Sequence, residues 1–346
     1  MKIFTRRLFA SLAACALGST LLGGPRPARA ADPAEVSVAI LYLTADTGIF
    51  LAIERGYFAE QGIHVNLSRI SSSADALALL ATNKLDVGSG SATPGLYNAF
   101  RRGIPVQIVA DKSDQLPPGK DTGGILVRKD LADNGETATV AGLKGKRIAV
   151  NNIQSMSLNH VMRALALANL DRDDVTLVEM PMSQFIPAMK KKAVDAVLAF
   201  SPLYAAMIKM QLAAPLPEAS LDNIAKGDTF NMMLFSDQFA KSDTAKRFMV
   251  AFLKGQRDLQ RAVDGKADIK EVCQVIHKYV PTMAADCTGL TFTSIDPDGG
   301  VNLPSLERYQ QEWLKWGVMS EPADIKSHVN SALSRHAVQV LGPYSK

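Results

Sequence analysis

Short apolar runs alternate with amphipathic stretches along most of this chain. The runs VSVAIL at 36–41 and KRIAVN at 146–151 are rich in Val, Ile and Ala, and a polar loop follows each of them. Continuous apolar runs of this length are typical of parallel strands, because helices cover both faces of a parallel sheet. Between the runs, apolar residues recur every three or four positions, as at 49–58 and 158–167, which predicts helices that bury one side.

The same order of strands and helices occurs twice, with a shift of about 110 residues. HVNLSRISSS at 64–73 corresponds to DVTLVEMPMS at 174–183, and LDVGSGSATPGLYNA at 85–99 corresponds to VDAVLAFSPLYAA at 194–206. The last pair keeps three residue types in place: Asp86 with Asp195, Pro94 with Pro202 and Tyr97 with Tyr204. Two similar βαβαβα units are therefore predicted, which is the alternation of an α/β fold.

The glycine- and serine-rich stretch LDVGSGSATPGLY at 85–97 has three candidate roles: a phosphate-binding loop, a flexible linker, or a turn between a strand and a helix. It lacks the Gly-Lys-Ser/Thr of a P-loop. Thr93 suits a helix N-cap and Pro94 suits the first helical turn, which argues against a linker. We therefore predict a turn whose small side chains let a ligand approach free backbone amides.

The predicted binding residues lie in the loops that follow the strands, because open α/β sheets bind ligands beyond the carboxyl ends of their strands. Most of these loops contain Ser or Thr at positions where a helix should begin. Hydroxyls and helix N-terminal amides together suit a small anion or another polar molecule. The candidates are Thr44, Asp46, Thr47, Ser72, Ser73, Gly90, Ser91, Ala92, Thr93, Asn152, Gln154, Ser155, Ser157, Ser201 and Tyr204.

Each of these residues also has a purely structural interpretation. A Ser or Thr at a helix start is an ordinary cap, and Asp46 either accepts a hydrogen bond from a ligand or caps the helix that begins near Gly48. Tyr204, together with Tyr42 and Phe200, forms an apolar wall for the ligand or belongs to the core. The concentration of hydroxyls on one edge of the predicted sheets favours binding.

The first 30 residues have the pattern of an export signal. Basic residues precede an apolar run at 8–22, and Ala28-Arg29-Ala30 is an A-x-A site, so cleavage is predicted near Ala30. The paired arginines at 6–7 fit both a twin-arginine signal and an ordinary secretory signal. LAAC, which ends at Cys15, resembles a lipoprotein box, but cleavage there would leave an apolar stretch behind it. Export in soluble form is therefore favoured.

The charge of the chain changes when the signal is removed. The full sequence has 38 Lys and Arg against 34 Asp and Glu, and the signal holds five of the basic residues and none of the acidic ones. The remainder is close to neutral and has no basic stripe with interleaved aromatics, which argues against nucleic-acid binding. With 47% hydrophobic and 21% charged residues, the chain has the composition of a folded protein.

Cysteines and catalytic motifs limit the chemistry further. After loss of the signal only Cys273 and Cys287 remain, and a disulfide between them is predicted in an oxidising compartment, with two buried thiols as the alternative. The five histidines are scattered, and no H-E-x-x-H, C-x-x-C or G-x-S-x-G pattern occurs. We predict no metal, no cofactor and no enzymatic activity.

Several segments resemble the periplasmic solute-binding proteins of nitrate/sulfonate/taurine-type ABC transporters, which share a superfamily with thiamine-pyrimidine-precursor proteins. They are IERGYFAEQGIHVNL, LDVGSGSATPGLYNAFRRGIPVQIVA, LKGKRIAVN and VDAVLAFSPLYAAMI, with DPDGGVNLPSLERYQQEWLKWGVMSEP resembling their C-terminal helical part. The resemblance implies a periplasmic-binding-protein type II fold, with two doubly wound α/β lobes, two crossover segments and a ligand cleft between the lobes. Lobe one would hold 35–127 and 229–346, and lobe two would hold 128–228.

The resemblance also implies a function. Such a protein would be a monomer in the periplasm that closes on a small-molecule ligand and delivers it to an ABC transporter permease in the inner membrane. The predicted ligand is a small organic anion, a sulfonate or carboxylate. Many relatives carry an acidic residue or a tryptophan at the positions of Phe200-Ser201-Pro202-Leu203-Tyr204, and this chain departs from them there. The alternatives are a sensing module for a membrane receptor and a binder of a pyrimidine or thiamine precursor; the fungal pyrimidine-precursor synthases use a cysteine-rich motif that is missing here.

Overall fold

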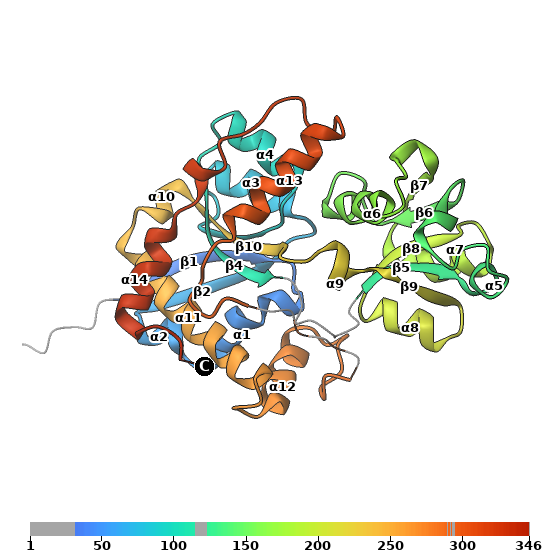
Figure 1. The fold of residues 1–346 in the computed structure, drawn as a ribbon. Helices are drawn as coiled ribbons and strands as arrows, with labels where there is room; N and C mark the ends of the chain where they lie inside the picture. The colour runs from blue at the N-terminus through green and yellow to red at the C-terminus, as the bar shows by residue number, and fades with distance from the viewer. Residues whose placement is uncertain (1–31, 115–122, 289, 291, 293–294, 346) are drawn as a thin grey trace, which may run out of the picture. The chain divides into compact units, whose positions relative to one another are not determined.

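The computed structural model describes residues 32–114, 123–288, 290, 292 and 295–345 (Figure 1). The predicted signal peptide lies outside the described residues. Within them the chain forms two mixed five-stranded sheets flanked by helices. No helix in this part of the chain is long and apolar enough to cross a bilayer.

The first sheet has the strand order β2-β1-β3-β10-β4. Its strands are β1 (Ala34–Ile40), β2 (Ile63–Arg69), β3 (Val87–Gly90), β4 (Val106–Asp114) and β10 (Thr229–Ser236). β1 pairs in parallel with β2 and β3, whereas β10 is antiparallel to β3 and β4. The helices of the same segments are α1 (Thr47–Glu54), α2 (Tyr57–Glu60), α3 (Ser73–Ala81), α4 (Pro94–Arg101), α10 (Asp237–Ala240), α11 (Asp243–Val263), α12 (Ile269–Tyr279), α13 (Leu303–Lys315) and α14 (Ser331–Leu341).

The second sheet has the order β7-β6-β8-β5-β9. Its strands are β5 (Gly123–Arg128), β6 (Arg147–Val150), β7 (Thr176–Glu179), β8 (Ala196–Phe200) and β9 (Ala213–Ser220). β6 is parallel to β7 and β8, and β5 is antiparallel to β8 and β9. The accompanying helices are α5 (Lys129–Asp133), α6 (Met156–Ala166), α7 (Phe185–Lys190), α8 (Leu203–Lys209) and α9 (Leu221–Ile224).

Both sheets are covered on two faces, as the continuous apolar runs predict. In β1, Val36 and Val38 pack with residues of α1 and α11, while Ala39, which follows Val38, packs with residues of α4 and α13. In β6, Ile148 packs with α6 and its neighbour Ala149 packs with α7 and α8. Successive side chains of a strand point to opposite faces, so the buried parts of these central strands carry apolar residues on both faces.

The two predicted repeats are the units from β1 to α4 and from β6 to α8. In both, the third strand pairs with an antiparallel strand from outside the repeat: β10 beside β3, and β5 beside β8. The position of β5 corrects one predicted boundary, because residues 35–127 are predicted to belong to the first lobe. All six residues of β5 are buried in the second sheet, where the strand bridges β8 and β9. Residues 123–127 therefore belong to the second sheet.

Local sequence signals place the turn at the end of β3 as predicted. Thr93 is the N-cap of α4, and its hydroxyl accepts a hydrogen bond from the amide of Leu96 at 3.2 Å. Pro94 occupies the first turn of the helix. Gly90 allows β10 to approach closely, because a Cβ atom there would lie 2.5 Å from Leu234 Cδ1. In the C-terminal region, a disulfide joins Cys273 of α12 to Cys287 in the following loop.

Candidate functional site

A cavity of about 360 Å³ is lined by residues that follow strands of both sheets. Hollows of about 430 and 440 Å³ are lined mainly by α14 and the loop before it, and one of about 450 Å³ by the start of α4, the loop after β6 and residues 317–318. The cavity lies where an open α/β sheet ordinarily binds its ligand. Its lining residues are Leu43, Thr44, Ala45, Ser91, Ala92, Ser113, Asn151, Ser155, Met156, Ser157, Met182, Phe200, Ser201, Phe230 and Asn231.

Hydrogen bonds orient the polar side chains on the first-sheet side. Ser91 Oγ donates to Asn231 Oδ1 at 3.2 Å, and Asn231 Nδ2 donates to Ser113 Oγ at 3.1 Å. This chain of contacts links the loop after β3 to β10 and β4, which are neighbours in the sheet. Three side chains from distant parts of the sequence are thereby held in one row at the cavity.

The second-sheet side is organised by the N-terminus of α6. Ser155 is the N-cap, and its hydroxyl accepts from the amide of Ser157 at 3.2 Å. Ser157 Oγ donates to Asn151 Oδ1 at 2.6 Å, which leaves the Asn151 amide group as a donor. Among the described residues, the hydroxyls of Thr44 and Ser201 have no hydrogen-bond partner, so they can serve a ligand.

No side chain that lines the cavity carries a formal charge. Two buried charges next to lining residues in the sequence are paired with each other: the Lys112 ammonium contacts the Asp46 carboxylate, and Ser89 Oγ donates to the same carboxylate at 2.9 Å. Asp46 and Lys112 are only 1% and 2% exposed. The remaining electrostatic contribution comes from hydroxyl and amide dipoles and from the N-terminus of α6, whose partial positive charge favours anions.

Six of the predicted binding residues line the cavity, and the others have positions elsewhere. Asp46 forms the ion pair with Lys112 and also accepts from the amide of Leu43 at 3.0 Å. Thr47 is fully buried and donates to the carbonyl of Thr44 at 2.7 Å. Tyr204 belongs to α8 and is 2% exposed, with its side chain in the core of the second sheet. The six at the cavity are Thr44, Ser91, Ala92, Ser155, Ser157 and Ser201.

The other predicted residues cap helices or line adjacent hollows. Ser72 is the N-cap of α3. Ser73, Gly90 and Thr93 line a smaller hollow of about 250 Å³ that also includes Ser91. Asn152 Oδ1 accepts from the amide of Gln154 at 2.6 Å, and Gln154 lines one of the larger hollows. These positions lie at helix starts or within three residues before one, which explains why the sequence pattern selected them together with the cavity residues.

Ser113, Asn231 and Phe230 line the cavity but were not predicted. They belong to β4 and β10, which lie outside the two repeats, so the comparison of repeats did not select them. A usable signal was present in the sequence, because Asn231 interrupts the otherwise apolar strand TFNMMLF and Ser113 follows the apolar run VQIVA closely. Polar residues at the ends of buried strands are a general marker of this edge of a sheet.

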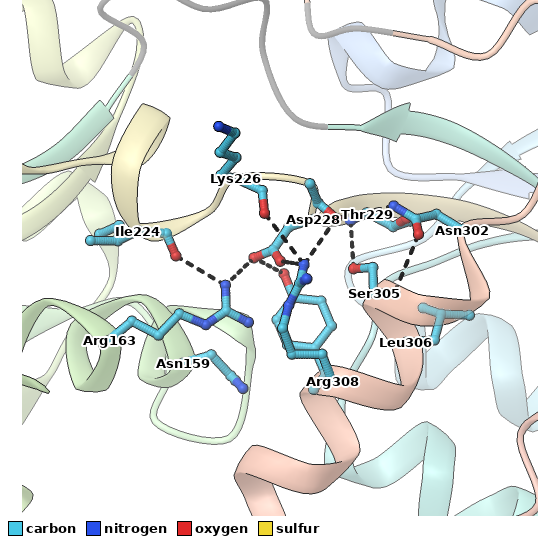
Figure 2. Close-up of polar contacts among 12 residues, drawn as sticks. Asn159, Arg163, Ile224, Lys226, Asp228, Thr229, Asn302, Ser305, Leu306 and Arg308 are labelled. Carbon is cyan, nitrogen blue, oxygen red and sulfur yellow. Dashed lines mark hydrogen bonds and ion pairs between the residues drawn. The ribbon is translucent and has the colours of Figure 1, made fainter.

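A buried charged cluster lies beside the cavity, at the segment that leads from α9 into β10 (Figure 2). Asp228 is fully buried. Its Oδ2 atom lies 2.7 Å from Arg163 Nη1 and 2.7 Å from the Tyr309 hydroxyl, and its Oδ1 atom lies 2.5 Å from Arg308 Nη2. In Figure 2 the two arginines reach the aspartate from α6 and from α13. Arg163 also binds Glu312 of α13 with two hydrogen bonds of 2.7 and 2.9 Å.

The cluster determines the ionisation of its members. Burial opposes the charge on Asp228, but the hydrogen bond from His160 and the charge of Arg163 outweigh burial and lower the pKa of Asp228 to about 2. Burial lowers the pKa of His160. His160 Nε2 lies 3.1 Å from Asp228 Oδ2, and among the described residues Nδ1 has no partner. His160 is therefore neutral and donates from Nε2.

The cluster also contacts the wall of the cavity. The His160 ring meets Phe200 and Phe230 edge-on, with centroid distances of 6.3 and 5.9 Å. Both phenylalanines line the cavity. Their positions thus depend on a histidine that is held by a buried carboxylate.

Comparison with known proteins gives matches in sequence and in structure. Residues 44–262 match the family model described as NMT1/THI5 like. The 4-amino-5-hydroxymethyl-2-methylpyrimidine phosphate synthase THI11 of Saccharomyces cerevisiae is 34% identical over 100 residues, which are 29% of this chain and 27% of that protein. The chain thus matches only about a quarter of the length of the curated relatives.

Solved structures match over almost the whole chain. The periplasmic aliphatic sulphonate binding protein SsuA from Escherichia coli is 18% identical, with 88% of this chain and 99% of that chain covered and a TM-score of 0.69. The periplasmic nitrate-binding protein NrtA from Synechocystis PCC 6803 is 14% identical, with 90% of both chains covered and a TM-score of 0.66. These matches confirm the predicted fold class.

Proposed function

Because this chain belongs to the NMT1/THI5-like family, we propose that it is an extracytoplasmic solute-binding protein that captures a small molecule and delivers it to an ABC transporter permease. The observation that carries the proposal is the cavity, to which both sheets contribute neutral polar groups. A ligand contacts residues of both sheets only while both sheets lie within reach of it. Ligand binding would therefore stabilise this arrangement relative to any arrangement in which the contacts to one of the sheets are lost.

Binding fits the chemistry of the cavity better than catalysis. A serine nucleophile needs an adjacent base, and the lining residues include hydroxyls but no histidine, lysine, aspartate or glutamate. No group of three or more metal-ligating side chains occurs in the part of the chain that the structure describes. The fold is shared with proteins described as sulphonate- and nitrate-binding.

The proposed ligand is a small organic anion, a carboxylate or sulfonate. The hydroxyls of Thr44 and Ser201, the Asn151 amide and the start of α6 supply donors at the cavity. Donors of this kind bind oxyanions without a formal counter-charge. Scavenging would require a Kd in the micromolar range or tighter, about −8 kcal/mol.

A pyrimidine precursor is the second candidate. It is favoured by the 34% identity with the yeast pyrimidine phosphate synthase, which extends over 100 residues. A pyrimidine has ring nitrogens and an amino group that the mixed donors and acceptors of Ser91, Asn151 and Asn231 can satisfy.

Thermal-shift and calorimetric titrations of the chain without residues 1–30 test the proposal. The compounds are carboxylates, sulfonates, nitrate, aminopyrimidines and polyamines. The expected result is a raised melting temperature and a micromolar Kd with organic acids. Binding of only cationic or neutral compounds contradicts the anion assignment, and no binding by any compound contradicts the solute-binding function itself.

A further inference from the structure

The apolar half of the cavity lining indicates which part of the solute lies there. Seven of the fifteen lining residues are apolar, and Met156, Met182, Phe200 and Phe230 supply the largest of these side chains together with Leu43. Leu43 is 41% exposed and Met182 is 40% exposed, and both belong to the few large apolar side chains on the surface of the described residues. Exposed apolar groups that gather at one cavity mark a site that an apolar partner covers.

The volume of the cavity leaves room for a solute larger than a small inorganic anion. A water molecule takes about 30 Å³ in the liquid, so a cavity of about 360 Å³ holds roughly twelve groups of that size. An oxyanion of four or five atoms would fill less than half of this volume. A six-membered ring with an acidic substituent fills most of it.

The wall that would contact the ring is held in place before binding. Phe200 and Phe230 both pack edge-on against His160, which is fully buried. His160 in turn bonds to the buried carboxylate of Asp228. Fixed aromatic rings contact a flat ligand by stacking or edge-to-face packing, and they lose little conformational freedom when it binds.

We infer that the solute is a monocyclic aromatic acid, with its ring against Phe200, Phe230 and the two methionines and its oxyanion on the hydroxyl and amide groups of the lining. This inference rests on the proposed solute-binding function and specifies its substrate class. The headgroup chemistry is shared by carboxylates and sulfonates. Because no lining side chain is charged, the apolar contacts supply the selectivity for the body of the solute.

Calorimetric titration with a matched series of acids tests the inference. Benzoate and benzenesulfonate distinguish the two headgroups, acetate and nitrate lack the ring, and cyclohexanecarboxylate keeps the volume without aromaticity. We expect the better aromatic acid to bind at least about tenfold more tightly than acetate or nitrate. Equal or tighter binding of acetate or nitrate overturns the inference but leaves the anion assignment intact, whereas no binding in the whole series overturns both the inference and the anion assignment.

Two variants show whether the contacts lie at this wall. Met182→Ala, at the cavity, should weaken aromatic-acid binding about threefold or more and leave acetate binding unchanged. Met210→Ala is the matched control, because Met210 is also exposed, at 47%, but lies at the end of α8 outside the cavity. Phe200→Leu, which keeps an apolar side chain, should weaken aromatic acids more than cyclohexanecarboxylate. Unchanged affinities in both cavity variants overturn the inference.

Discussion

The cavity and the charged cluster at Asp228 share helix α6 but differ completely in charge. The cavity is lined by hydroxyls, amides and apolar groups, with no formal charge. The cluster joins two arginines and two carboxylates, and Asp228 within it is fully buried. Ser157 of α6 faces the first region, while Arg163 of the same helix belongs to the second.

The charged cluster and the neutral cavity have different tasks in the molecule. Buried charges are tolerated when they are paired and hydrogen-bonded, and such pairs fix geometry more than they add stability. Here they hold α6, α13 and the segment before β10 together. The cavity can then select its solute by shape and by neutral donors, because no unpaired charge of the protein has to be satisfied there. Changes in the cluster should therefore alter mainly the stability, and changes at the cavity should alter mainly the affinity.

The largest effect is expected from Asp228→Asn. The substitution keeps a side chain of the same shape but leaves Arg163 and Arg308 facing a neutral group, with one buried charge uncompensated. We expect the free energy of unfolding to fall by about 3–5 kcal/mol, as for other broken buried pairs. Urea denaturation followed by circular dichroism measures it. Asp133→Asn is the matched control, because Asp133 pairs with Lys129 at the surface, where a pair contributes about 0–1 kcal/mol; equal effects of the two substitutions would show that the cluster does not carry this stability.

The pH dependence of stability separates Asp228 from His160. The pKa of Asp228 is lowered to about 2 in the folded protein, so its contribution is complete above the unfolded pKa of about 3.9 and is lost as the pH falls toward 2. Asp228→Asn should remove this acid-labile component. Unfolding curves between pH 2 and pH 5 for both proteins provide the measurement; identical slopes would contradict the low pKa.

His160 acts in a higher pH range with the same sign. Burial lowers its pKa in the folded state, so below about pH 6.5 the unfolded chain binds a proton that the folded protein does not, and stability falls with falling pH. His160→Gln should flatten the stability profile between about pH 5 and pH 7. A wild-type slope in His160→Gln would place the titrating group elsewhere.

Smaller effects are expected from substitutions of two serines that were both predicted as binding residues. One substitution should change the ligand affinity and the other the stability. Ser157→Ala removes a hydroxyl at the cavity and should weaken ligand binding by about 1 kcal/mol, about fivefold in Kd. Ser72→Ala removes the N-cap of α3 and should lower stability by about 1 kcal/mol with no change in Kd. Calorimetry and urea denaturation on both variants test this. If Ser72→Ala weakens binding as much as Ser157→Ala, the site extends beyond the cavity.

Local patterns in the sequence were sufficient for much of the fold. Apolar runs, helical spacing and the duplicated segments predict both repeats, and Thr93 and Pro94 mark the start of α4 because capping is decided within a few residues. Local patterns could not predict β10 and β5, the fourth strands in the order of the two sheets. β10, for example, pairs with β3 across about 140 residues of chain. Nothing local indicates that pairing.

The same distinction between local signals and distant partners explains which site residues could be predicted from the sequence. Ser91, Ser155 and Ser157 were predicted because they lie at helix starts next to repeated strands. Asp46 has the same local signal, yet its carboxylate pairs with Lys112, 66 residues away. The partners of Asp228 are equally distant, at separations of 65 to 81 residues. Side chains whose role depends on a distant partner need the tertiary structure before they can be assigned.

The smallest expected effect concerns salt, and it sharpens the comparison between the neutral cavity and the charged cluster. An ion pair between a ligand and an exposed side chain weakens with ionic strength, because the Debye length falls from about 10 Å at 0.1 M to about 3 Å at 1 M. The cavity lining supplies no charged side chain, and the attraction of a helix N-terminus acts within one turn. The Kd for an aromatic acid should therefore change by less than about twofold between 0.05 and 0.5 M sodium chloride. Ser91→Lys, which adds a charge to the lining, should create a clear salt dependence in the same titration. A strong salt dependence in the unmodified protein would mean that a charge of the protein reaches the solute, and the division between the two regions would then not hold.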